Sequence, residues 1–142
     1  DYWPYFRPTI AEEMKRKEED EYVAAVRDRF LATGCTRGKF GVGDEKSAKD
    51  MKEQGVSLEL LQEALLLGAC RKYDSWLNGG SPQPVGSLAY FEALISEVQN
   101  QPFPPGYCEY LQTKVPQLAR MWEETKAAAL SAKSKAKPPL DK

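Results

Sequence analysis

Cationic and aromatic side chains alternate in the stretch CRKYDSWLNGG, residues 70–80. Cations attract the phosphates of a nucleic acid backbone, and aromatic rings stack on its bases. A further aromatic side chain comes near the start of the next apolar segment. The residue types in this part of the chain indicate a surface for nucleic acid, made of Arg71, Lys72, Tyr73, Trp76 and Tyr90.

The same residues also fit a purely structural role. Tyr73 and Trp76 can pack in the core of the protein. Arg71 and Lys72 then complement the negative end of a helix. Both interpretations stay open on the sequence alone.

A second group of cations lies at the C-terminus. Residues 125–142 contain five lysines and only one acidic residue, Asp141, although the net charge of the whole chain is −1. We assign Lys133, Lys135 and Lys137 to a flexible arm that contacts phosphates or an acidic partner. The alternative is a solvated terminus that binds nothing.

The sequence offers little for catalysis. It contains no histidine, which excludes Ser-His and Cys-His pairs and zinc sites of the mixed Cys/His type. The carboxylates fall in runs such as residues 18–21, which are typical of a solvated helix face. The glycines of residues 34–44 lack the spacing of a phosphate-binding loop and favour a flexible connector. We therefore predict a protein that is not an enzyme and has no cofactor and no metal.

The three cysteines lie far apart, at positions 35, 70 and 108, and their odd number leaves at least one unpaired. This pattern is typical of a reducing compartment, so we predict a cytoplasmic protein. No run approaches the roughly 18 apolar residues of a membrane helix, and we expect no membrane contact. The chain opens at Asp1 rather than at a methionine, as an excised fragment or a processed chain does.

Hydrophobic periodicity predicts an all-α fold, because apolar residues recur at three- and four-residue spacings and period-two alternation is missing. We expect helices over residues 10–33, 45–54, 58–78, 88–99 and 107–131. Thr9 with Glu12, Ser57 and Ser87 are the expected helix caps, and Asp44 or Ser47 is expected to cap the second helix. Pro116 should weaken or kink the last helix, and a start after Lys114 is the alternative to a start at residue 107.

These elements predict one compact helical domain of about five helices over residues 10–132. An extended aromatic segment, residues 1–9, precedes it, and a flexible basic tail, residues 133–142, follows it.

The helices at 58–78 and 88–99 are joined by a short loop, so we expect them to pack antiparallel. The core between them should contain Leu61, Leu65, Phe91, Leu94 and Ile95. Tyr90 is turned about 100° from Phe91 on the helix and should lie at the edge of that core, with its hydroxyl directed to polar groups or solvent.

Residues 44–98 resemble a known family. A helix ended by glycine, a Ser-capped helix with the sequence QEAL, and the pattern S-x-x-Y-F-x-x-L-I at residues 87–95 are similar to the C-terminal domain of DnaD-like replication and primosome proteins. That family carries a Y-x-x-x-I-x-x-x-W signature. Its positions correspond to Tyr90, Leu94 and Val98, so the tyrosine is kept and the tryptophan is absent.

The resemblance implies a helical domain that binds single- or double-stranded DNA, or that loads partner proteins, during replication initiation. Because the tryptophan is missing, the resemblance does not support the family's DNA contact at that helix. The same composition suits an adaptor or small subunit of a larger nucleoprotein or mobile-element complex, which meets protein rather than DNA. Such a module would expose an apolar patch, for which Tyr2, Trp3, Tyr5 and Phe6 are the candidates.

Overall fold

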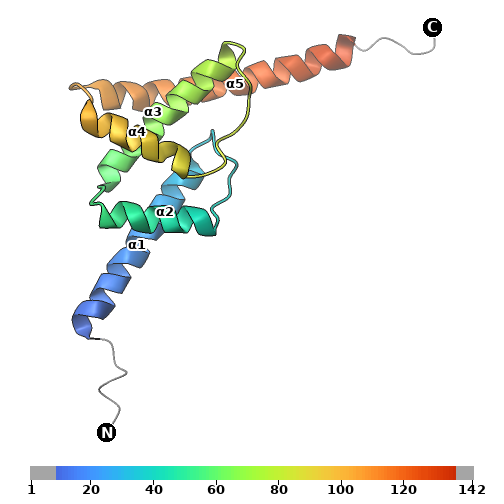
Figure 1. The fold of residues 1–142 in the computed structure, drawn as a ribbon. Coiled ribbons are helices and arrows are strands. Elements are labelled where there is room, and N and C mark those ends of the chain that lie inside the picture. Colours follow the sequence, from blue (N-terminus) through green and yellow to red (C-terminus); the bar gives the residue numbers. More distant parts are fainter. Residues whose placement is uncertain (1–8, 137–142) are drawn as a thin grey trace.

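The computed structural model describes residues 9–136 and contains five α-helices (Figure 1). Within this range the only β pairing is an isolated bridge between Thr36 and Val85, so the predicted all-α class is confirmed. The aromatic residues at positions 1–8 lie outside the described part of the chain. The helices are α1 (Ile10–Ala32), α2 (Val42–Glu53), α3 (Leu58–Leu77), α4 (Ala89–Asn100) and α5 (Tyr107–Ala136).

The last helix differs most from its prediction. It runs unbroken from Tyr107 to Ala136 with Pro116 inside it. The predicted start at residue 107 is therefore confirmed, and the alternative start after Lys114 is wrong. Proline removes one N–H from a helix and frees the carbonyl four residues earlier, here that of Gln112. Both residues are exposed, and water can satisfy the freed carbonyl. The helix also includes residues 133–136, which were predicted to belong to a flexible tail.

Local sequence sets the start of two helices as predicted. The Thr9 hydroxyl accepts from the Glu12 N–H at 3.1 Å, and the Glu12 carboxylate accepts from the Thr9 N–H at 3.3 Å, which completes a capping box. At α3, Ser57 accepts from the N–H of Leu60 at 3.1 Å.

A buried carboxylate rather than Ser87 orders the start of α4. Asp44 Oδ1 accepts from the Leu88 N–H at 2.8 Å, and Oδ2 accepts from the Gly41 N–H at 2.9 Å. Gly41 is the N-cap of α2 and Asp44 lies inside the helix, so the predicted cap at Asp44 or Ser47 is wrong. The Asp44 carboxylate instead closes the first turn of α2 and fixes α4 beside it. The predicted cap at Ser87 is wrong, because Leu88 is the residue that flanks α4. Its N–H donates to the carboxylate of Asp44, which comes from α2.

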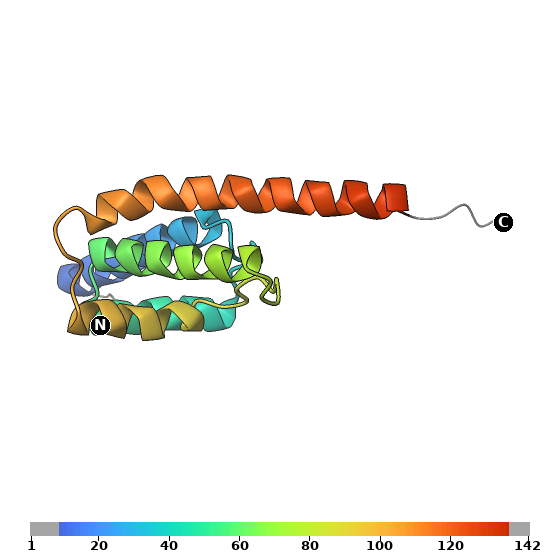
Figure 2. The ribbon, with the colours of Figure 1, turned by 90° about the horizontal axis from the view of Figure 1, so that it is seen from above.

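The helices form layers around α3. Seen from above, α5 lies on one side of α3 and α4 on the other, with α1 near the level of α3 and α2 near that of α4 (Figure 2). Helices α3 and α4 pack against each other but cross steeply in Figure 1, so the expected antiparallel arrangement is wrong. The glycine-rich connector between α1 and α2 is tied to the loop before α4, since Val85 donates to Cys35 and accepts from Arg37.

The predicted core is confirmed. Each of its members is at most 6% exposed, and they share one cluster: Leu61, Leu65, Phe91, Leu94 and Ile95. Helices α3 and α4 approach closely at Gly68, where an added Cβ would lie 2.5 Å from Phe91 Cε1 and 2.7 Å from Leu94 Cδ1. Only a glycine at this position allows so short a distance between the helices without a shift.

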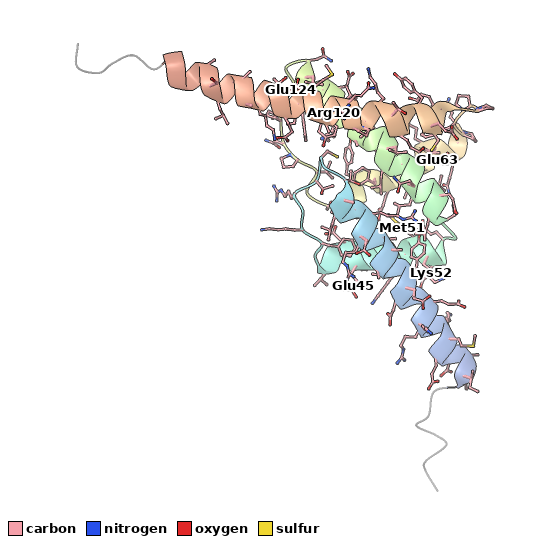
Figure 3. All side chains as sticks on the ribbon, turned by 180° about the vertical axis from the view of Figure 1, so that it is seen from behind. Glu45, Met51, Lys52, Glu63, Arg120 and Glu124 are labelled. Atoms are coloured by element: carbon pink, nitrogen blue, oxygen red, sulfur yellow. The ribbon has the colours of Figure 1, made fainter. Side chains whose placement is uncertain are left out.

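Two helix ends project from this body (Figures 1 and 3). In α1, residues 10–18 are all exposed, and packing begins at Tyr22, whose hydroxyl donates to the Val56 carbonyl at 2.8 Å and whose ring lies below Lys52. In α5, Trp122 is the last partly buried residue before the exposed residues 123–132, among them Glu124, labelled in Figure 3. In the described range, no helix is both long and apolar enough to cross a membrane.

Candidate nucleic-acid interface

The C-terminal half of α3 and the facing side of α4 bring three of the sequence-predicted residues together. Arg71 and Lys72 come from α3, and Tyr90 comes from the first turn of α4. The close approach at Gly68, one turn earlier on α3, sets the distance between these groups. We call the edge formed by Arg71, Lys72, Tyr90 and Glu97 the α3–α4 rim.

An ion pair with two hydrogen bonds spans the α3–α4 rim. Arg71 Nη1 donates to Glu97 Oε1 at 2.9 Å, and Nη2 donates to Oε2 of the same carboxylate. The two side chains are 49% and 42% exposed. Their hydrogen bonding raises the pKa of Arg71 and lowers the pKa of Glu97 relative to their ordinary values. Both groups are therefore charged near neutral pH.

The second cation of the rim lies over an aromatic ring. Lys72 Nζ is 4.8 Å from the ring centroid of Tyr90, within the range of a cation–π interaction. Tyr90 is half-buried and meets the ring of Phe91 edge to face at 5.1 Å, whereas Phe91 is fully buried. The predicted division between a core Phe91 and an edge Tyr90 is confirmed. Burial is the main cause that raises the pKa of Tyr90.

Tyr73 and Trp76 do not belong to this edge. They are 5% and 7% exposed and meet each other edge to face at 5.4 Å. Trp76 also lies 5.4 Å from Trp122 of α5, which covers it. Their assignment to a base-stacking surface is wrong, because buried rings offer no free face to a base. The alternative interpretation is correct for these two residues, because both pack in the core.

Two tyrosines at the start of α5 were missed as interface candidates. Tyr107 lines a pocket with Arg71 and Glu97, and Tyr110 stacks on Tyr107 at 5.8 Å with an interplanar angle of 22°. Tyr110 is 53% exposed. The helical spacing could have indicated this exposure. Positions 107, 110 and 114 form one stripe along the helix, and the buried Leu111 and Leu118 form the next.

Two of the three predicted lysines are on a part of α5 that is separated from the rim. Lys133 and Lys135 lie on the last turns of α5, whose backbone extends away from the body (Figures 1 and 2). From Trp122 to position 133 the helix rises roughly 16 Å. Lys137 lies outside the described residues. The helix backbone therefore does not place Lys133 and Lys135 on one continuous surface with Tyr90.

No arrangement suited to covalent chemistry appears in residues 9–136. The three thiols are unpaired, and burial raises the pKa of each, to about 11 for Cys35, so they stay protonated near neutral pH. The groove between α1, α3 and α5, about 380 Å³, has Arg29 and Tyr73 as its only ionisable lining residues. In the same range, no three His, Cys, Asp or Glu side chains gather as metal ligands would.

Comparison with known proteins adds no relative, since no family model, no curated protein and no solved structure matches this chain. The likeness to the DnaD-like family thus rests on the residues of the sequence alone.

Proposed function

We propose that this domain is a non-catalytic module that binds single-stranded DNA within a cytoplasmic nucleoprotein complex, such as one that initiates replication or acts on a mobile element. The observation that supports it best is the meeting of Arg71, Lys72 and Tyr90 on one edge. Tyr107 lines a pocket with Arg71, and the exposed ring of Tyr110 stacks on Tyr107. A single strand needs cations for its phosphates and exposed rings for its bases.

The parts of this edge have different roles in the proposal. Arg71 and Lys72 supply positive charge, and the ring of Tyr90 holds the Lys72 ammonium at the edge of the body. Tyr110 offers the free stacking face, because Tyr107 covers only one side of it. The lysines at the end of α5 form a second, distant contact to the same strand. Single-stranded DNA is favoured over a duplex because the bases of a duplex are already stacked on one another.

The test is a salt titration of binding. Fluorescence anisotropy would follow a labelled oligo-dT longer than the roughly 4–16 nucleotides that single-strand-binding domains cover, and a duplex of equal length. We expect binding to the single strand at about 50 mM salt and a marked loss at about 200 mM, since released counterions drive the contact. Equal or tighter binding to the duplex would contradict the single-strand proposal, and no binding to either would contradict DNA binding altogether.

A specific observation favours a second candidate, a protein-interaction adaptor in a primosome-like or other assembly. Both projecting helix ends carry exposed apolar side chains: Ile10 and Met14 on α1 and Leu130 on α5 are 76%, 58% and 70% exposed. Exposed apolar groups on helices that leave the body suit a protein partner. If the oligonucleotides do not bind at low salt, this adaptor function replaces DNA binding.

A further inference from the structure

Arg71, the strongest phosphate ligand of the α3–α4 rim, is already engaged by Glu97. Resting on the proposed function, we propose that Arg71 forms a phosphate-binding site which Glu97 fills in the free protein, and that a backbone phosphate binds by replacing the Glu97 carboxylate.

The geometry of the pair supports this exchange. A guanidinium presents parallel N–H groups that match two oxygens of a carboxylate or of a phosphate equally well. Both oxygens of Glu97 accept from Arg71 in this way. The carboxylate therefore stands where two oxygens of a phosphate would bind, on a guanidinium that is already oriented.

The surroundings allow the carboxylate to leave. Both side chains are about half exposed, so water can solvate Glu97 once it is released. Ion pairs at such exposed positions contribute little to stability, and their loss should not unfold the domain. A pocket of about 240 Å³ lies beside the pair, lined in part by Gln101, Phe103 and Tyr107. It provides room for the sugar and base attached to the incoming phosphate.

The exchange has a consequence that is opposite to the usual effect of mutating an interface residue. Removing the charge of Glu97 should tighten DNA binding, because the phosphate no longer competes with a carboxylate. The matched control is Glu92, which is also on α4 and exposed, and which is in none of the ion pairs within residues 9–136. E92Q and E97Q change the net charge equally, so their difference isolates the release of Arg71.

We expect E97Q to bind the oligo-dT about two- to fivefold more tightly than E92Q, the range that corresponds to loss of an exposed ion pair. In the R71Q background the two substitutions should have equal effects, because no guanidinium remains to be released. Circular dichroism of each variant checks that the helices are retained. If the wild type binds DNA and E97Q binds no more tightly than E92Q, the exchange is refuted while DNA binding stands.

A phosphate ligand can also come from a small molecule rather than from DNA. Inorganic phosphate alone, titrated while the Arg71 Nε–Hε resonance is followed by NMR, distinguishes the two sources. If no variant binds the oligonucleotide but phosphate shifts this resonance in E97Q and not in E92Q, the phosphate site is supported and the proposed DNA function fails. If neither ligand acts on any variant, both proposals fail.

Discussion

Helices α3 and α4 meet in two different ways within about one helical turn. At the crossing, formed by Gly68, Phe91 and Leu94, the contact is apolar and leaves no room for an added methyl group. At the α3–α4 rim, Arg71 and Glu97 are about half exposed and joined by polar contacts. The same two helices thus place a rigid contact beside an adaptable one. Changes at the crossing should alter stability, and changes at the rim should alter binding.

The largest effect is expected in the core that supports the crossing. Leu65 is 1% exposed, and Leu65→Ala should lower the free energy of unfolding by about 2–5 kcal/mol, because apolar burial is reduced and a cavity is left behind. Leu130→Ala removes the same atoms from a side chain that is 70% exposed. It should change the free energy of unfolding by less than about 0.5 kcal/mol. Urea denaturation of both variants measures the difference, and similar values would contradict the packing described for α3.

Substitution of the exposed ring at the edge should reduce binding and spare stability. Tyr110→Ala should weaken oligo-dT binding by about 1–3 kcal/mol, the usual contribution of one stacked base. Leu130→Ala, at a 70% exposed site on the same helix, should leave affinity unchanged. Anisotropy titrations give the affinities. An unchanged affinity for Tyr110→Ala would remove this ring from the proposed interface.

A single methyl group tests the crossing itself. Gly68→Ala gains up to about 1 kcal/mol of helix propensity but places a Cβ 2.5 Å from Phe91. Because overpacking costs about 1–3 kcal/mol, we expect a net loss of stability. Gly43→Ala, in α2 with no atom within 4 Å of the added Cβ, should be neutral or slightly stabilising. Thermal unfolding compares the pair, and a stabilised Gly68→Ala would show that α3 and α4 can move apart without cost.

Local periodicity in the sequence predicted the features that depend on residues of a single helix. The separation of Phe91 from Tyr90, and the capping box of Thr9 and Glu12, follow from spacings of one to three residues. The helix class and the shared core follow for the same reason, since an amphipathic face must be covered.

Contacts between distant segments could not be predicted in this way. Burial of Trp76 depends on Trp122, 46 positions later, and without that contact its ring fits a surface as well as a core. The Glu97 partner of Arg71 lies 26 residues away. The bond from Leu88 to Asp44 spans 44 residues. Each requires knowledge of how the helices are placed, which the periodicity of a single helix does not contain.

The smallest expected effect concerns the three predicted lysines near the C-terminus. If Lys133, Lys135 and Lys137 bind phosphates, their replacement by glutamine should reduce the slope of log affinity against log salt by roughly 0.7 for each single-strand phosphate that is no longer neutralised. Glutamine at Lys15, Arg16 and Lys17, on the projecting half of α1, makes an equal change in net charge at the other end of the molecule. Titrations of the two triple variants from about 50 to 200 mM salt separate direct phosphate binding from bulk charge. A reduced slope for the C-terminal lysine set alone would place a second phosphate-binding region beyond the rim, whereas equal slopes for both sets would limit the interface to the body of the domain.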